Sequence, residues 1–582
     1  MKPSISLPIL LLLLVPRALL SGADLPAAPP QHRRPENFKP FHYKLTTEQL
    51  MARFSAGQMK RAEAEFAEMA KVNDKGPWKP VWESLDKHGA PEWFLDAKLG
   101  IMLNWGLHSV PAWDLKRDQG AMYPDAYGNQ MYHSKEVRDY HVRNWGADFE
   151  WDDFLPLFKA ENYDPEALLQ LWQQAGARYL ITMSKHHDGI AWWDSKWTQR
   201  NTVQMGPMKD VFTPLMTAAK KRNFKVVMYF CLNEYATAVL GDDDKPYVRN
   251  WTWPQGQPNL LPLDAANRRR ISGAIPVRNC FRHYTTPLVK EAIDRFDPDG
   301  LWFDGEWTDP VEALDTRELA AYFYNKAEGR KEVTVNDRYA QGTRDHHGDY
   351  FCSEHNTTQS YQHPWEETQG IAQSFAYNWQ DDDERLGTPT DLIHRFIRIV
   401  SDNGNLVIIG GPASSGRYPE TVVARLKALG AWLRVNGEAI YATRVLPPYQ
   451  EGRVSYTRSK NGRFAYAICK EWPGRQLTLK GVRADANAAI TLLGVEKPLV
   501  WRQGDEALVI DIPDSLQDEK ARPCQHAWSV RIPMAVTDKT YKLRFAGRGG
   551  VCRRRITALL SSRWRTERAR GPVGSGVFDA RR

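Results

Sequence analysis

Two carboxylates, Asp304 and Glu306, follow an apolar stretch in the segment GLWFDGEW at 300–307. The three residues before them, Leu-Trp-Phe, have the composition of a buried strand. Burying a carboxylate among aromatic rings costs free energy unless the charge is paired. Acids in this setting therefore indicate a functional site, and glycoside hydrolysis is one reaction that uses a pair of carboxylates flanking an anomeric carbon.

Polar residues also end the other apolar stretches of the middle of the chain. They are Asn104, His186–His187–Asp188, Asn233–Glu234, Asn336–Asp337, Glu354–His355 and Tyr377–Asn378. Because the C-terminal ends of parallel barrel strands meet on one face, we expect these side chains to share one rim. Glu354 then becomes a second carboxylate that could face Asp304 across the barrel mouth.

Other chemistries fit the sequence less well. A serine hydrolase of the GxSxG type is excluded because that motif is absent. Histidines are paired at 185–189 (KHHDG) and 344–350 (RDHHGDY), but neighbouring residues of a strand point to opposite faces, so each pair supplies one metal ligand at most. We therefore expect no metal and no other cofactor. The 22 tryptophans suit core packing and also a cleft in which rings stack on sugars.

Apolar strands alternate with amphipathic helices from about residue 92. The expected strands are 99–106, 178–189, 225–234, 300–307, 332–338, 348–355, 373–379 and 405–412, with helices such as 164–177, 211–224 and 285–299. This alternation predicts a parallel sheet with helical crossovers, and about eight strands suit a (β/α)8 barrel. A doubly wound open sheet is the alternative, but no glycine-rich dinucleotide fingerprint follows the first strand.

Five segments are predicted along the chain. They are a signal peptide (1–23), a leader with a helical N-terminal segment (24–91), a catalytic (β/α)8-like barrel (92–445), a C-terminal antiparallel β-sandwich (446–536) and a basic, disordered tail (537–582). The sandwich is predicted from short alternating runs such as RVSYTRS and ALVIDIP. The tail holds thirteen Lys and Arg against three Asp and Glu, so the remaining chain is close to neutral.

The N-terminus predicts export. Lys2, the apolar run LPILLLLLV and the small residues that follow are typical of a secretory signal peptide. The protein is then periplasmic or extracellular in a bacterium, or lysosomal or secreted in a eukaryote. We expect no membrane association after cleavage and no nucleic-acid partner. The six cysteines lie far apart without a CxxC motif, so mostly free thiols are expected.

The chain resembles glycoside hydrolase family 29, the retaining α-L-fucosidases. The stretches that carry the likeness are LGIMLNWGLHSVPAW, AGARYLITMSKHHDG, DGLWFDGEW, EVTVNDR, GDYFCSEH, NGEAIYATR and AWSVRI. The resemblance implies Asp304 as nucleophile and Glu354 as acid/base, with Glu366 of PWEE as the alternative. For Glu306, a supporting rim residue and a solvated loop acid both remain open. The implied substrate is a fucosylated oligosaccharide or polysaccharide.

The resemblance also implies a sugar site, from which this chain departs in places. Its substrate-binding residues are Asn104, Trp105, His186, His187, Tyr229, Trp302 and Phe375, with Phe375 against the C5 methyl group of fucose. Asn104 stands where the family has histidine, and Ala121 and Met122 stand where it has a Glu and a Trp that bind the O3/O4 side. Ile409 replaces an asparagine.

These replacements favour a diverged enzyme that acts on decorated fucose, carrying for example a sulfate or a branch. Two alternatives remain open at this point. One is a glycosidase for a related sugar such as α-L-galactose, and the other is a carbohydrate-binding relative without turnover. Retention of both Asp304 and Glu354 favours an enzyme.

Overall fold

The computed structural model describes residues 27–116, 122–251, 259–262, 272–355 and 362–534. The predicted signal peptide, Ala121 and the basic tail lie outside the described residues. Within the described ranges, none of the helices combines the length and the hydropathy that a membrane crossing requires.

Eight parallel strands form the central sheet, in the order β10-β11-β12-β1-β2-β3-β8-β9. A parallel bridge between Asn336 and Tyr350 joins the two ends of this order, so the strands follow one another around a ring in chain order. This confirms the predicted (β/α)8 barrel. The strands are β1 (Leu99–Leu103), β2 (Tyr179–Lys185), β3 (Lys225–Cys231), β8 (Gly300–Asp304), β9 (Thr334–Val335), β10 (Phe351–Glu354), β11 (Trp365–Gly370) and β12 (Gly404–Gly410).

Helices connect most of these strands on the outside of the ring. Asp164 caps the first of them by accepting a hydrogen bond from the backbone N–H of Ala167, and Gly176 ends it with φ 96°, as the sequence predicts. The helices are α7 (Pro165–Ala175), α8 (Phe212–Lys221), α10 (Thr286–Phe296), α12 (Thr316–Ala327), α14 (Pro389–Ser401) and α15 (Glu420–Asn436).

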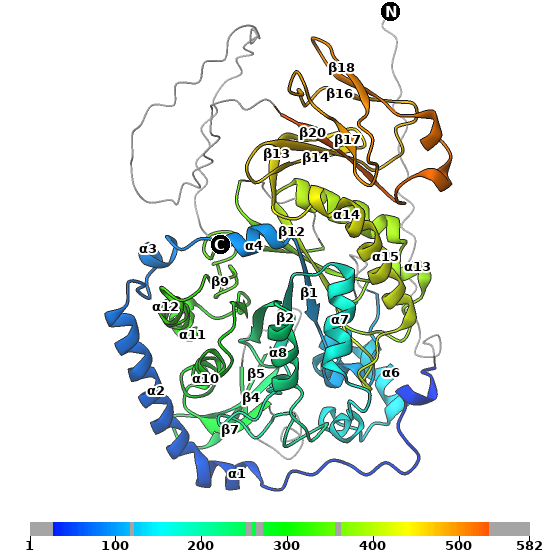
Figure 1. The fold of residues 1–582 in the computed structure, drawn as a ribbon. Helices are drawn as coiled ribbons and strands as arrows, with labels where there is room; N and C mark the ends of the chain where they lie inside the picture. The colour runs from blue at the N-terminus through cyan, green and yellow to red at the C-terminus, as the bar shows by residue number, and fades with distance from the viewer. Residues whose placement is uncertain (1–26, 117–121, 252–258, 263–271, 356–361, 535–582) are drawn as a thin grey trace, which may run out of the picture. The chain divides into compact units, whose positions relative to one another are not determined.

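The N-terminal segment covers an arc of the ring that has no helix of its own. In the described residues, no helix connects β9 to β10. There the ring of Trp82, in α3 (Trp82–Leu85), stacks on His347 with centroids 3.8 Å apart, and Nδ1 of His88 lies 2.8 Å from a carboxylate oxygen of Asp349. The long helix α2 (Ala56–Lys75) runs beside α12 (Figure 1).

The residues before α1 (Thr47–Leu50) lie against the loops of the barrel. Nδ1 of His32 is 2.7 Å from the carbonyl oxygen of Val110. The hydroxyl group of Tyr43 accepts a hydrogen bond of 2.7 Å from the guanidinium of Arg200. The leader is therefore attached at both ends of its described part.

The seventh strand is not where the sequence analysis placed it. The expected strand 373–379 is a loop, and the strand is β11, with the sequence WEETQG. The segment is polar, yet Glu366 is fully buried inside the ring. There the hydroxyl of Tyr179 and the indole N–H of Trp302 donate to its carboxylate at 2.7 and 3.0 Å. Because the carboxylate is satisfied internally, a polar segment can form a buried strand.

An additional small sheet interrupts the connection between β3 and α10. It has four strands in the order β6-β5-β4-β7, namely β4 (Ala236–Leu240), β5 (Pro246–Asn250), β6 (Asn259–Pro262) and β7 (Ser272–Val277) (Figure 1). The sequence analysis did not predict this sheet. It matters for the site because Trp251, directly after β5, is fully buried and stacks on His187, one of the predicted substrate-binding residues.

The C-terminal part contains two antiparallel sheets, which confirms the predicted β-sandwich. One has the order β13-β14-β15-β20-β17 and the other β16-β19-β18. Their strands are β13 (Thr443–Glu451), β14 (Val454–Ser459), β15 (Phe464–Cys469), β16 (Gln476–Leu479), β17 (Thr491–Leu492), β18 (Val500–Gln503), β19 (Leu508–Asp511) and β20 (Trp528–Pro533).

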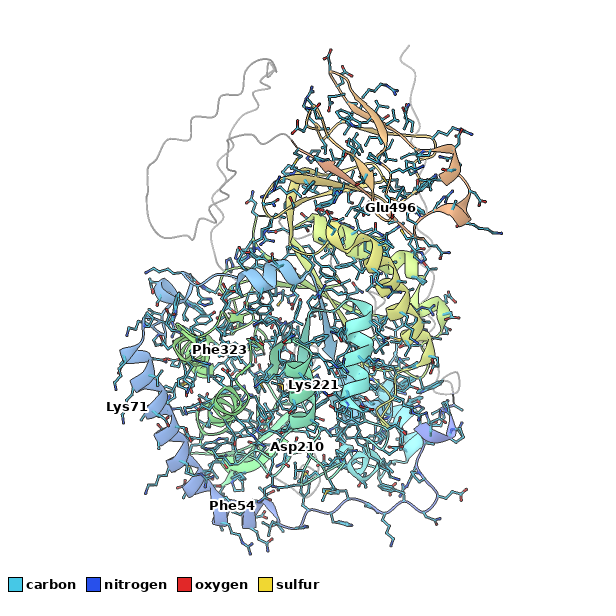
Figure 2. All side chains as sticks on the ribbon, in the orientation of Figure 1. Phe54, Lys71, Asp210, Lys221, Phe323 and Glu496 are labelled. Atoms are coloured by element: carbon cyan, nitrogen blue, oxygen red, sulfur yellow. The ribbon has the colours of Figure 1, made fainter. Side chains whose placement is uncertain are left out.

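Side chains fill the space between the strands and the surrounding helices of the barrel (Figure 2). Phe323 of α12 is buried in this layer, whereas Lys71 of α2 lies at the outer surface (Figure 2). The interior is closely packed, so the positions of the polar side chains at the strand ends are well determined by their neighbours.

Candidate active site

Asp304 is the last residue of β8, and its carboxylate is held by three neighbours. Oδ1 accepts a hydrogen bond of 2.7 Å from Nη2 of Arg338, and Oδ2 accepts one of 2.5 Å from the hydroxyl of Tyr229. Nε2 of His187 lies 3.4 Å from Oδ2. Burial disfavours the charge of Asp304, but Arg338 and His187 outweigh it and hold the pKa of this carboxyl well below its usual value.

Arg338 joins three carboxylates at the rim. Besides Asp304, its Nε donates to Oε2 of Glu306 at 2.6 Å, and its Nη1 donates to Oε1 of Glu354. The guanidinium is fully buried and lies over the ring of Trp302, 4.6 Å from the centroid. A guanidinium offers five N–H donors in a fixed fork, which is what three converging carboxylates require.

Glu306 is a buried member of this cluster. Its second oxygen, Oε1, accepts from Nη1 of Arg344 at 3.1 Å, and only 9% of its side chain is exposed. Burial and the neighbouring Asp304 raise the pKa of Glu306 to about 7, against the effect of Arg338. A solvated loop acid is thereby excluded, and Glu306 is a supporting residue held by two arginines.

The two candidates for the acid/base occupy different levels of the barrel. Glu354 ends β10 and keeps about a quarter of its side chain exposed. Glu366 is the second residue of β11, so it lies near the opposite end of the ring, fully buried against Tyr179 and Trp302. Burial raises the pKa of Glu366 to about 7. The structure brings Glu354, but not Glu366, to the guanidinium that binds Asp304.

Both histidines of KHHDG face the site, contrary to the expectation of opposite faces. Strand β2 ends at Lys185, whose buried ammonium donates to Glu234 at 2.8 Å, so strand alternation no longer applies to the next residues. The rings of His186 and His187 lie 4.9 Å apart. Nδ1 of His187 lies 2.6 Å from the carbonyl oxygen of Asn233, which accepts its proton and fixes the ring.

The two imidazoles carry opposite pKa shifts. Burial disfavours a charge on His187, but Cys231 and Asp304 raise its pKa well above the usual value. For His186, burial and the adjacent His187 lower the pKa well below the usual value. His187 is thus a cation beside Asp304, while His186 is neutral.

Aromatic rings surround the carboxylates. His187 stacks on Trp251 with centroids 5.2 Å apart and an interplanar angle of 7°, and Tyr229 stacks on Trp302 at 5.4 Å. Phe375 stacks on His355 at 4.5 Å, directly after Glu354. The polar groups of the site are therefore shielded from water on these sides, which strengthens their electrostatic interactions.

Asn104 lies at the end of β1, close to an aspartate that the sequence analysis did not select. Asn104 hydrogen-bonds to Asp125, and Oδ2 of Asp125 is 3.8 Å from Nε2 of His186. Burial raises the pKa of Asp125 to about 7. Gly411 allows this arrangement, because a Cβ at that position would overlap the backbone carbonyl of Asn104.

Some residues singled out in the sequence lie elsewhere. The indole of Trp105 donates to the carbonyl of Ala413 at 2.9 Å and stacks on Tyr163, so the structure does not bring it to Asp304. Met122 is buried and accepts a contact from Asn378 through its sulfur. Ile409 is buried within β12, opposite Met102 of β1.

The sequence analysis missed two residues of the site. Arg338 follows Asn336–Asp337 in EVTVNDR, and the need of several buried acids for a cation could have pointed to it. Asp125 follows no recognisable strand, so no sequence pattern marked it. Among the described residues there is no group of three or more His, Cys, Asp or Glu arranged to hold a metal ion, and Cys231, Cys280, Cys352, Cys469 and Cys524 are free thiols.

Comparisons with known proteins identify the family of the chain. The family model described as alpha-L-fucosidase matches residues 65–438, and that of the alpha-L-fucosidase C-terminal domain matches residues 449–533. Tissue alpha-L-fucosidase of Mus musculus is 31% identical over 467 residues, covering 78% of this chain and 94% of the mouse protein. The tissue alpha-L-fucosidase of Homo sapiens is 30% identical over 462 residues, covering 78% and 91%.

A solved structure shares the fold. The alpha-fucosidase of Thermotoga maritima, in complex with a mechanism based inhibitor, superposes with a TM-score of 0.63 and 29% sequence identity, covering 78% of this chain and 100% of that one. The match spans both the barrel and the C-terminal sheets that the sequence predicted. The chain belongs to the α-L-fucosidase family, glycoside hydrolase family 29, whose members are retaining glycosidases.

Proposed function

We propose that this protein hydrolyses α-L-fucosides with retention, using Asp304 as nucleophile and Glu354 as acid/base. The observation that carries this proposal is the shared guanidinium of Arg338, which binds both carboxylates through its two terminal nitrogens. Carboxyl groups about 5–5.5 Å apart are typical of retaining enzymes, and two acids on neighbouring nitrogens of one guanidinium suit that short separation.

In the first step, an oxygen of Asp304 forms a bond to C1 of the sugar while the bond from C1 to the leaving oxygen breaks. Glu354 gives its proton to that leaving oxygen. In the second step, Glu354 takes a proton from water, and the water oxygen replaces Asp304 at C1, so that the free sugar leaves and both acids return to their starting forms.

The environment of Asp304 suits the nucleophile. Arg338 and His187 overcome the effect of burial and keep its carboxyl ionised at the pH of the reaction. Burial and the charge of Asp304 raise the pKa of Tyr229 well above its usual value, so the phenol keeps its proton and continues to donate. These donors hold the carboxylate oriented without neutralising it.

Glu354 suits the acid/base better than Glu366. Glu354 lies at a strand end with part of its side chain exposed, where a leaving group and a water molecule can reach it. Glu366 is fully buried and both its oxygens already accept hydrogen bonds from Tyr179 and Trp302. We assign Glu366 the role of orienting Trp302 beneath Asp304 and Arg338.

The sugar itself is proposed to contact His186, His187, Asn104 and the aromatic group around Phe375. Phe375 with His355 and Tyr123 forms an aromatic wall, because their ring centroids lie 4.5 and 5.4 Å from that of Phe375. Such a wall favours the methyl group of fucose over the hydroxymethyl group of α-L-galactose. A fucosylated oligosaccharide or polysaccharide is therefore the proposed substrate, and no nucleic-acid partner is proposed.

Hydrolysis of 4-nitrophenyl α-L-fucoside tests the assignment, with Asp304→Ala and Asp402→Asn alongside. Asp402, which precedes β12, is a partly buried aspartate whose pKa burial raises to about 6, and it lies outside the site. We expect turnover by the wild type and Asp402→Asn, and none by Asp304→Ala. Covalent labelling of Asp304 by a 2-fluoro-fucosyl fluoride, located by peptide mass spectrometry, would identify the nucleophile directly. Turnover that survives Asp304→Ala would reject the mechanism.

We also propose that residues 1–23 direct export and are then removed. The basic start, the apolar run and the small residues at 21–23 support this proposal. Expression of the full chain in a secreting host, followed by N-terminal sequencing, tests it. A secreted product that begins near residue 24 is expected, and retention of Met1 on a cell-associated product would reject it.

A further inference from the structure

One tyrosine of the leader is hydrogen-bonded to a buried ion pair below the active-site histidines. The hydroxyl of Tyr43 donates to Oδ2 of Asp152 and accepts a hydrogen bond of 2.7 Å from Nη1 of Arg200. Nη2 of the same guanidinium donates to Oδ1 of Asp152 at 2.6 Å. Only 2% of each side chain of the ion pair is exposed. Tyr43 therefore joins both partners of an ion pair that is shielded from water.

Arg200 connects this ion pair to the turn that carries both histidines. Its Nε donates a hydrogen bond of 2.7 Å to the carbonyl oxygen of Asp188, the residue directly after His187. The turn is closed by the backbone N–H of Gly189, which donates to the carbonyl oxygen of His186 at 3.0 Å. The position of the turn therefore depends on the position of the guanidinium.

The hydroxyl of Tyr43 helps to fix that guanidinium. An arginine presents its N–H donors in a planar fork, and here all three nitrogens are used, on Asp188, Asp152 and Tyr43. Without the hydroxyl, Nη1 of Arg200 and Oδ2 of Asp152 each lose this partner in the interior, which costs free energy. The ion pair can reduce that cost by moving toward water, and Nε then moves with it.

Neighbouring contacts hold Tyr43 in place. The backbone N–H of Phe41 donates to Oδ1 of Asp153 at 2.7 Å, and the rings of Phe41 and Tyr43 lie 5.0 Å apart, edge to face. Thr46 caps α1 directly afterwards. Burial raises the pKa of Tyr43 well above its usual value, so the phenol keeps the proton that it donates to Asp152.

We propose that Tyr43 is a positioning residue for the reaction, which acts through Arg200 and holds the turn of His186 and His187 beside Asp304. This inference rests on the proposed function, because the two histidines are proposed to contact the sugar. Tyr43 precedes residue 65, where the match to the family begins. The support for the turn thus comes from the leader of this chain and not from the part that the family model describes.

The expected effect of losing this support is a change in geometry. Nε2 of His187 is 3.4 Å from Oδ2 of Asp304. A displacement of about 1 Å caused by a mutation far from the reacting atoms can lower the rate by roughly 100-fold. Loss of one hydroxyl shifts the turn by less than that, so we expect a smaller but measurable loss.

The test compares Tyr43→Phe with Tyr441→Phe on 4-nitrophenyl α-L-fucoside. Tyr43→Phe keeps the ring and removes only the hydroxyl. Tyr441→Phe is the matched control, because its hydroxyl donates to the carbonyl oxygen of Gly176 at 2.6 Å, before β2, whereas the histidines follow β2. With both variants shown to be folded by urea unfolding, we expect kcat/KM to fall at least fivefold for Tyr43→Phe and less than fivefold for the control. A loss below fivefold for Tyr43→Phe, or an equal loss in both variants, would overturn the inference.

A double variant shows whether Tyr43 acts through Arg200. Arg200→Lys keeps the positive charge, but its single nitrogen cannot bind Asp152 and the carbonyl of Asp188 in one fork. It should lower kcat/KM at least as much as Tyr43→Phe. Adding Tyr43→Phe to Arg200→Lys should then change kcat/KM by less than twofold, because the connection is already broken. Full activity of Arg200→Lys, or a further loss of twofold or more in the double variant, would count against the inference.

Amide hydrogen exchange measures the turn without any substrate. The N–H of Ile190 donates to Oδ1 of Asp188 at 3.2 Å. This amide and that of Gly189, followed by mass spectrometry, should exchange at least fivefold faster in Tyr43→Phe than in the wild type and in Tyr441→Phe. Equal exchange in all three would overturn the inference, and this measurement also decides it if Arg200→Lys does not fold. If the wild type hydrolyses no fucoside, the proposed function fails, and exchange decides separately whether Tyr43 holds the turn.

Discussion

Replacing Arg338 by lysine tests whether one guanidinium organises the whole site. Arg338 is fully buried and uses three different nitrogens on Asp304, Glu306 and Glu354. Lysine keeps the positive charge but offers a single nitrogen, which cannot donate in the fork geometry that three carboxylates require. We expect the variant to fold with its carboxylates less well paired.

The magnitude follows from the bonds that are lost. A hydrogen bond to a charged group contributes about 1.5–3 kcal/mol, and lysine can keep at most one of the three in good geometry. Part of this loss falls on folding and part on the transition state. If about 3–4 kcal/mol falls on the transition state, kcat/KM decreases by roughly 10²–10³, at 1.36 kcal/mol for each factor of ten.

The pH dependence provides an independent readout. Burial raises the pKa of Asp304, and Arg338 is the main group that lowers it again, so weakening the pair moves this pKa upward. Because Asp304 must be ionised to attack, the acid limb of kcat/KM against pH shifts to higher pH in Arg338→Lys. The measurement is a pH profile on 4-nitrophenyl α-L-fucoside.

Arg344→Lys is the matched control, since Arg344 reaches Glu306 but not Asp304. It should change kcat/KM by less than tenfold and leave the acid limb in place. A profile of Arg338→Lys that coincides with the wild type, with kcat/KM within tenfold, would refute the idea that Arg338 sets the state of the nucleophile.

Three further predictions concern single side chains. Glu354→Ala should lower kcat/KM far more for a fucosyl disaccharide than for 4-nitrophenyl α-L-fucoside, because the nitrophenolate leaving group needs no proton. Azide should restore turnover. Equal losses on both substrates would argue against Glu354 as the acid/base. Relative to the wild type, Glu366→Gln should gain up to about 3 kcal/mol more in the free energy of urea unfolding at pH 7.5 than at pH 5. A carboxyl with a pKa of about 7 in the folded state contributes stability that is present at low pH and lost as pH rises, and glutamine does not suffer that loss. An unchanged pH dependence would contradict this. Phe375→Ala should lower kcat/KM on the fucoside by about 10- to 100-fold but less on the α-L-galactoside, since a lost methyl contact costs about 1–3 kcal/mol. If the ratio of kcat/KM for the two substrates stays constant, Phe375 does not contact the methyl group.

The sequence was sufficient to predict the strands and helices whose apolar residues form a simple pattern. Strands β1, β2, β3, β8 and β12 are mostly apolar and overlap the expected ranges. Strand β11 was missed because its buried Glu366 is satisfied by Tyr179 of β2 and Trp302 of β8, and a sequence pattern does not show such pairing. The small sheet β4–β7 was missed because its strands are short and partly polar.

The same limit applies to the site. Asp304 and Glu354 could be selected because they follow apolar strands. His186 and His187 were expected on opposite faces of a strand, which was wrong because strand alternation ends at Lys185. Arg338 and Asp125 lie in connecting segments, where position depends on tertiary contacts rather than on a period, so their roles emerged only from the structure.

The cover that the N-terminal segment gives the barrel also sets an order of events during synthesis. Asn73 and His88 contact Glu318 and Asp349, which follow 245 and 261 residues later in the chain. At a ribosomal rate of about 5–20 residues per second, roughly 10–50 s pass before those partners exist. For most of that interval α2 lacks the elements on which it packs, because α10 and α12 follow it only at Thr286–Phe296 and Thr316–Ala327. In the nascent chain, the N-terminal segment is therefore the part that is exposed longest to chaperones and proteases. This segment is synthesised first, but it packs on the barrel last.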